Sequence, residues 1–147
     1  MAAPSRPPEA GLPGRFKTFK PGERELAAEF IRSGLIPGEV RPGIPLESEK
    51  SRQVARENPQ AGYWDRYPWM YKMDLVIEGP EEVWIVEIKE KIRMAALSQL
   101  LLYRSLYREQ FPTEKPIRLA LVARRDSPEL RAVTEAQGVA VFLLPGG

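Results

Sequence analysis

Two carboxylates and an ammonium group lie close together in the middle of this chain, around one short turn. Asp74 belongs to an apolar run that ends at Ile77, and Glu87 and Lys89 belong to a second apolar run after the turn. Both runs are rich in β-branched and aromatic residues, which is typical of the strands of a β-hairpin. If the loop consists of residues 79–82, Asp74 lies directly opposite Glu87, and Lys89 shares their face of the sheet.

Two opposed acids need a counterion. Directly opposed residues have Cβ atoms roughly 4.5–5.5 Å apart, so like charges there destabilise the ladder. The chain contains no Cys and no His, which excludes thiolate and imidazole metal sites and the Ser-His-Asp triad. The remaining carboxylate and carbonyl oxygens suit Mg²⁺ or Mn²⁺. A bland alternative stays open, because Glu-x-Lys near a strand end is also common in solvated charged runs, and Glu90 and Lys91 continue this one.

A further carboxylate lies on an upstream helix. Pro21 and Gly22 are expected to begin this helix, which runs to about Ser33 before Gly34. Its apolar stripe consists of Leu26, Ala27, Phe30 and Ile31. Glu23 falls inside that stripe, where it is either an acid favoured by the helix dipole in the first turn or a ligand.

The second half of the chain predicts alternating helices and strands. A helix is expected over residues 92–109, with Gln99 and Tyr103 side by side at spacing i, i+4. A buried strand over 117–123, a helix over 128–137 and a last strand over 139–144 follow. Strands that alternate with helices indicate a mixed sheet with α/β packing.

Taken in order, these features resemble the PD-(D/E)xK phosphodiesterase superfamily of restriction endonucleases, archaeal Holliday-junction resolvases and RecB-like nucleases. Asp74 and Glu87-Ile88-Lys89 are similar to its signature, and Glu23 is similar to its helical acid. Gln99 and Tyr103 resemble the Gln-x-x-x-Tyr motif of the RecB-like branch. Met73 stands where the family name has Pro, and the His that the RecB-like branch often carries is missing. The resemblance covers residues 23–144.

The resemblance implies an α/β, restriction endonuclease-like core, in which helices flank a central mixed β-sheet in the order αβββαβ, followed by a C-terminal αβ unit. It implies that the catalytic residues are Asp74, Glu87, Lys89 and Glu23. The implied metal ligands are Asp74, Glu87, the Ile88 carbonyl and Glu23, the last directly or through water. Lys89 could orient the attacking water, accept its proton or stabilise the phosphorane. Gln99 and Tyr103 would position the metal site or the substrate.

The resemblance therefore implies a Mg²⁺- or Mn²⁺-dependent deoxyribonuclease that acts on DNA in repair, recombination, restriction or phage DNA processing. The alternative is a catalytically silent nucleic-acid-binding or assembly protein that retains the nuclease fold. A homodimer or a larger nuclease complex is a further possibility for either function.

An aromatic run precedes the first hairpin strand. Alternation with period two from Tyr67 to Ile77 predicts one continuous apolar strand face in the core. Tyr63 and Trp64 lie before this alternation and are candidates for stacking on unpaired bases. The expected nucleic-acid contacts are Lys91, Arg93, Tyr63, Trp64 and Arg66.

Composition indicates one globular domain. The chain has 147 residues, of which 43% are hydrophobic, which suits a single domain over residues 16–147. Residues 1–15 are Pro-rich and expected to be disordered, and 35–62 is expected to be an irregular, variable insertion with a possible charged helix over 46–57. No apolar run suggests a membrane span or a signal peptide, so a cytoplasmic location is expected. Abundant Pro and Arg and the missing Cys fit a thermophilic source or a GC-rich genome.

Overall fold

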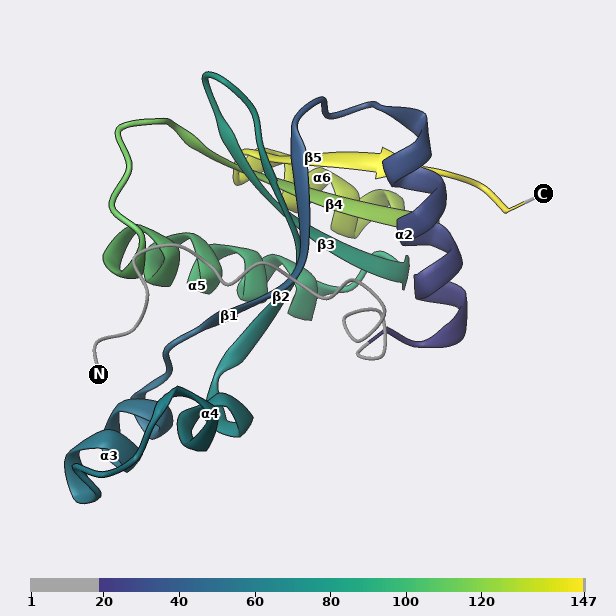
Figure 1. The fold of residues 1–147 in the computed structure, drawn as a ribbon. Coiled ribbons are helices and arrows are strands. Elements are labelled where there is room, and N and C mark those ends of the chain that lie inside the picture. The colour runs from purple at the N-terminus through teal and green to yellow at the C-terminus, as the bar shows by residue number, and fades with distance from the viewer. Residues whose placement is uncertain (1–18, 147) are drawn as a thin grey trace.

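The computed structural model describes residues 19–146, which form an α/β fold around a five-stranded sheet (Figure 1). Its elements are α2 (Pro21–Ser33), β1 (Glu39–Leu46), α3 (Glu49–Glu57), α4 (Tyr63–Arg66), the 3₁₀ helix η2 (Tyr67–Trp69), β2 (Tyr71–Glu78), β3 (Val83–Lys91), α5 (Met94–Gln110), β4 (Ile117–Arg125), α6 (Pro128–Ala136) and β5 (Val139–Leu143). The strands lie in the order β1-β2-β3-β4-β5. The first three pair antiparallel and the last three pair parallel, which confirms an α/β protein with a mixed sheet flanked by helices.

The hairpin of β2 and β3 has the register that the sequence predicts. Leu75 pairs with Val86 and Glu78 with Val83, and the loop is residues 79–82. The N–H of Gly79 donates to the carbonyl of Glu82 at 2.9 Å, which closes the turn. Because the loop length is fixed, the next pair along this register is Asp74 with Glu87.

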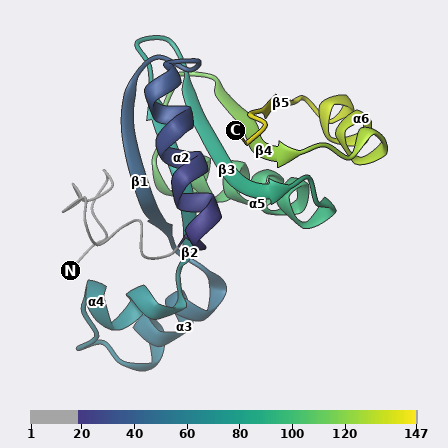
Figure 2. The same ribbon diagram turned by 90° about the vertical axis from the view of Figure 1, so that its right-hand side faces the viewer.

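Helices cover both faces of the sheet and bury two separate apolar layers. On one face, α2 contributes Leu26 and Phe30 to a core that contains Leu75 and Val86. On the other face, α5 contributes buried residues such as Leu100 to a core against which α6 also packs. The two views show α2 and α5 on opposite sides of the sheet (Figures 1 and 2).

The prediction of one apolar strand face from Tyr67 to Ile77 is wrong. Residues 67–69 form η2, and the strand begins only at Tyr71. Within β2, Met73 lies in the core under α5, whereas Ile77 lies in the core under α2. The apolar residues of β2 change from one face of the sheet to the other at Asp74. By register, Asp74 lies opposite Gly43 of β1. The backbone of Gly43 is left-handed, with φ 66°. A residue with a side chain rarely adopts that conformation, and the strand pair bends there.

The region 35–62, expected to be irregular, contains the edge strand β1. Pro42 and Pro45 hide this strand in the sequence, but an edge strand needs backbone N–H groups on one side only, so it tolerates proline. The chain between β1 and β2 forms α3, α4 and η2, which lie at the far end of these two strands, away from the rest of the sheet (Figure 1). The charged helix expected within 46–57 is α3, and the Ser48 side chain caps its first turn.

The tail expected to be disordered, residues 1–15, lies outside the described residues. Within residues 19–146, none of the helices combines the length and the apolar character that a membrane crossing requires.

Candidate active site

Asp74 and Glu87 lie where β2 and β3 separate. The ladder between these strands ends at the Leu75–Val86 pair, and further toward its start β2 pairs only with β1. The separation frees backbone amides, and the two carboxylates accept them. The N–H of Ile88 donates to Oδ2 of Asp74 at 2.8 Å, and the N–H of Asp74 lies 3.4 Å from Oε1 of Glu87. The backbone of each strand therefore orients the acid of the other.

A cavity of about 190 Å³ lies beside this acid pair, between α2, β3 and α5. Its walls mix acids and cations, and the lining residues are Lys20, Glu23, Lys89, Glu90, Arg93, Ala95, Ala96 and Gln99. The ammonium Nζ of Lys89 lies 3.7 Å from Oε2 of Glu87, so it links the buried acids to the cavity. The structure thus brings the hairpin residues, the helical acid and one residue of the downstream helix to one place.

The acid pair resists carrying two negative charges. Burial raises the pKa of Asp74 to about 6, although the Ile88 amide and the Lys89 charge act in the opposite direction. The pKa of Glu87 is also raised, first by burial and then by the charge of Asp74. A buried carboxylate near a like charge is destabilised in its ionised form. A divalent cation between them would reverse this effect and release their protons.

Gln99 and Tyr103 come to the site from α5. Burial raises the pKa of Tyr103, and the negative charges of Glu87 and Asp74 raise it further, so this phenol stays protonated and close to the acids. Oε1 of Gln99 is buried and accepts no hydrogen bond from any described residue. A buried acceptor without a donor costs about 1–3 kcal/mol, and such a cost in a cavity wall is typical of a group that awaits a ligand or a bound water.

Glu23 lies in the first turn of α2, buried and in the cavity wall. Its charge contributes to the raised pKa of Asp74. Within residues 19–146, however, no three side chains of the types His, Cys, Asp and Glu surround one metal position. The residues present still fit Mg²⁺ or Mn²⁺, because the Asp74 and Glu87 carboxylates and the Ile88 carbonyl are hard oxygen donors and these ions keep several waters. Glu23 would then act through water.

Two charged residues of the cavity wall escape the sequence prediction. Lys20 directly precedes α2, and Glu90 follows Lys89 on β3. A Cβ atom added to Gly22 would collide with the carboxylate of Glu90, which shows how closely the first turn of α2 approaches β3. In the sequence, Gly22 indicates a close approach of some kind, but no local pattern shows that its neighbour is Glu90.

The predicted nucleic-acid contacts divide into three groups. Arg93 lines the cavity, whereas Lys91 is exposed on β3 and is not among the lining residues. Trp64 is strongly exposed and Tyr63 is half-buried beside it. Arg66 is a correction: its guanidinium is buried in an ion pair with Glu47 at 3.0 Å, so it stabilises the fold and cannot reach a phosphate.

Comparison of the chain with protein-family models, with curated proteins and with solved structures gave no match. The interpretation of the site depends on its own geometry and on the resemblance of its motifs.

Proposed function

We propose that this chain is a Mg²⁺- or Mn²⁺-dependent nuclease that hydrolyses DNA phosphodiester bonds and has a restriction endonuclease-like core. The observation that carries the proposal is the acid pair of half-buried Asp74 and buried Glu87, with the amine of Lys89 beside it at the edge of a cavity. The mixed sheet, the helical acid Glu23 and the placement of Gln99 support the same function.

Phosphodiester hydrolysis needs an attacking water, neutralisation of the charge on phosphorus and help for the leaving oxygen. A bound Mg²⁺ would supply an acidified water and polarise a phosphate oxygen. Asp74 and Glu87 present their oxygens without rearrangement, because backbone amides already hold them. Lys89 would stabilise the charge that develops on the phosphate and orient the water. Loss of one preorganised donor of this kind typically lowers the rate by ~10²–10³.

The cavity also suits the phosphate group of a substrate. Three cations, Lys20, Lys89 and Arg93, line it together with Gln99. Arg and Lys side chains are the usual partners of nucleic-acid phosphates. A phosphate in this cavity would contact Lys89, whose amine lies 3.7 Å from Oε2 of Glu87, and would thus lie near the acid pair.

One observation favours the second candidate, a silent nucleic-acid-binding protein. The described residues lack a cluster of three acids around one metal position, so the metal site has a smaller charge than a three-carboxylate site. The silent protein would bind DNA with strong salt dependence and would show no metal-dependent turnover.

The test is a cleavage assay on supercoiled plasmid, linear duplex, single-stranded and four-way-junction DNA, with Mg²⁺, Mn²⁺ or EDTA. Lys89→Ala should lower the rate by at least ~10²-fold, whereas the matched control Lys115→Ala, which removes a lysine that pairs with Glu78 near the hairpin turn, should cleave at the wild-type rate. Equal activity of Lys89→Ala and wild type would refute the mechanism. Salt-dependent DNA binding without cleavage of any substrate and without Mn²⁺ binding by calorimetry would establish the silent protein.

A further inference from the structure

The segment that links β1 to β2 carries the most exposed large aromatic side chains of residues 19–146. Trp64 is 71% exposed, Trp69 is 50% exposed, and Tyr71, the first residue of β2, is 42% exposed. Together with Tyr63 and Tyr67 they form the aromatic surface of this protein. Exposed aromatic groups of this size mark binding sites more often than scattered single apolar residues do.

The rings of the aromatic surface hold one another in place. Trp64 packs edge-on against Tyr63, with ring centroids 5.0 Å apart and an interplanar angle of 86°. Its ring centroid also lies 5.2 Å from that of Tyr67. Such aromatic pairs contribute roughly 0.5–1.5 kcal/mol of stability beyond the contribution of the apolar area that they bury. Trp64 is therefore oriented by its neighbours while most of its indole remains open to a ligand.

Two lysines lie against these rings. Nζ of Lys72 lies 4.5 Å from the ring centroid of Tyr67, and Nζ of Lys50 lies 5.3 Å from that of Trp69. Neither amine makes an ion pair with a carboxylate within the described part of the chain. The arginines of the same segment are paired: Arg52 with Glu109, Arg56 with Glu49, and Arg66 with Glu47. Lys50 and Lys72 thus place two amines complementary to phosphate beside these rings, while Asp65, the acid next to Trp64, accepts the N–H of Gly62 at 2.8 Å.

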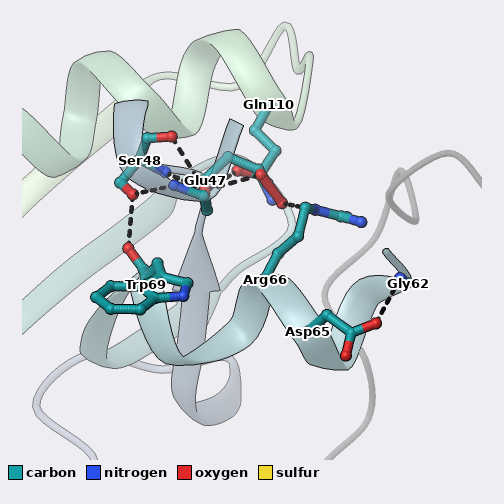
Figure 3. Close-up of polar contacts among 8 residues, drawn as sticks. Glu47, Ser48, Gly62, Asp65, Arg66, Trp69 and Gln110 are labelled. Carbon is teal, nitrogen blue, oxygen red and sulfur yellow. Dashed lines mark hydrogen bonds and ion pairs between the residues drawn. The ribbon is translucent and has the colours of Figure 1, made fainter. Parts of the chain in front are cut away.

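A buried polar network fixes this segment to the rest of the fold (Figure 3). The carboxylate of Glu47 pairs with Nε of Arg66 at 3.0 Å. The backbone N–H of Glu47 donates at 2.7 Å to Oε1 of Gln110, which lies at the end of α5. The hydroxyl of Ser48 donates to the carbonyl of Trp69 at 2.6 Å. These contacts join α4 and η2 to β1 and α5. The aromatic surface therefore keeps a set position relative to the candidate active site.

One end of the aromatic surface reaches that site. The ring centroid of Tyr71 lies 6.1 Å from that of Tyr103, whose pKa responds to the charges of Asp74 and Glu87. Tyr71 is three residues before Asp74 on β2, which corresponds to about 10 Å along a strand. A DNA strand with a phosphate in the cavity would pass the aromatic surface within a few nucleotides.

We propose that the aromatic surface binds unpaired nucleotides, so that the substrate is DNA with a single-stranded segment next to the cleaved bond. The reference to cleavage depends on the proposed nuclease function, but the binding surface does not. Bases in a duplex are stacked on each other and closed to these rings, whereas unpaired bases stack on aromatic side chains with little regard to sequence. Lys50 and Lys72 would contact the phosphates between the stacked bases.

The test measures binding of a fluorescent single-stranded oligonucleotide, and of its duplex, to the full chain in EDTA, where no metal-dependent cleavage occurs. The wild type should prefer the single strand. Trp64→Ala/Trp69→Ala should weaken single-strand binding by roughly 5- to 150-fold per stacked base and duplex binding by much less. Leu35→Ala is the control, because Leu35 is also 50% exposed but lies outside the aromatic surface. Lys50→Ala should lower the slope of log affinity against log salt by about 0.7.

Unchanged single-strand binding by the double tryptophan variant, or an equal loss on single strand and duplex, would overturn the inference. Circular dichroism of the variant ensures that a loss is not caused by unfolding. Single-strand preference that needs both tryptophans, without any metal-dependent cleavage, would support the aromatic surface and overturn the nuclease. Cleavage that needs Lys89, with binding indifferent to Trp64 and Trp69, would support the nuclease and overturn the aromatic surface.

Discussion

Asp74→Asn should stabilise the metal-free protein while removing its metal binding. Burial raises the pKa of Asp74 from 3.8 to about 6. Because a tenfold change in an acid dissociation constant corresponds to about 1.4 kcal/mol, ionisation of this carboxyl at pH 8 costs the fold up to about 3 kcal/mol. Asn is neutral and similar in shape, and its side-chain oxygen can still accept the amide of Ile88. Part of the full effect is lost to relaxation and solvent, so we expect a gain of about 1–3 kcal/mol in the free energy of unfolding.

The raised pKa of Asp74 also determines how the stability gain of Asp74→Asn changes with pH. The pKa of Asp74 is higher in the folded protein than in the unfolded chain. Between about pH 4 and pH 6, Asp74 is therefore protonated in the folded protein and ionised in the unfolded chain. The unfolding free energy of the wild type therefore falls as pH rises through this window. The advantage of Asp74→Asn should be near zero at pH 4 and fully developed above pH 6. A domain of this size melts about 3 °C higher for each kcal/mol, so the gain at pH 8 is about 3–9 °C.

Thermal denaturation in EDTA at pH 4, 5, 6, 7 and 8 measures this difference. Addition of Mn²⁺ at pH 8 should invert the order, since a ligand at about 1,000 times its dissociation constant stabilises the native state by about 4.1 kcal/mol and the variant should not bind it. Asp126→Asn is the matched control. Asp126 makes a surface ion pair with Arg131 at 3.3 Å, which is worth at most about 1 kcal/mol.

A variant less stable than the wild type at pH 8 in EDTA would refute the reasoning, because it would mean that the ionised acid contributes to the metal-free fold. An equal gain at pH 4 and pH 8 would also refute it, since the effect would then not come from charge.

Three further predictions concern stability and metal binding. Arg66→Ala should lower the free energy of unfolding by about 3–5 kcal/mol in urea denaturation, because it leaves the buried carboxylate of Glu47 without its cation, and Arg66→Ala/Glu47→Gln should recover part of this loss. Gly38→Ala should cost about 1–3 kcal/mol, because Gly38 has φ 149° and an added Cβ would lie 2.7 Å from the carbonyl oxygen of Glu78; a melting temperature equal to that of the wild type would contradict this. Gln99→Met should leave stability unchanged or up to about 1 kcal/mol higher, since it removes a buried acceptor without a donor, while Mn²⁺ affinity measured by calorimetry falls at least ~10-fold.

The acid pair could be predicted from the sequence because a hairpin register depends only on local information. Once the turn residues define a loop over 79–82, the register of the two strands follows, and it brings Asp74 and Glu87 to the position where the ladder ends. Glu23 was predictable for a similar reason, since the helical period alone places it on the buried face with Leu26. In both cases short-range geometry decides the outcome.

Long-range packing decides what the sequence did not predict. Tyr67 and Trp69 continue the alternation of the strand, but residues 67–69 fold as η2, where the Tyr67 ring packs on Tyr63 and Trp64 of α4. The predicted order αβββαβ includes a strand before the hairpin, but the residues of β1 were not located, because its prolines are acceptable only on an edge, which is a property of the sheet. Glu90 joins the cavity through the approach of β3 to Gly22, a contact for which the sequence has no local signal.

The ladder between β1 and β2 ends at Leu46 and Tyr71, which lie directly opposite each other. Two residues in that position can be joined by a two-residue turn. All of α3, α4 and η2 could therefore be lost, lengthened or exchanged in evolution without any change in the register that places Asp74 opposite Glu87. Under the proposed function, the segment that would bind the substrate is thus separate from the site that would cut it, and chimaeras that join other segments between Leu46 and Tyr71 offer a route to new substrate preferences on an unaltered sheet.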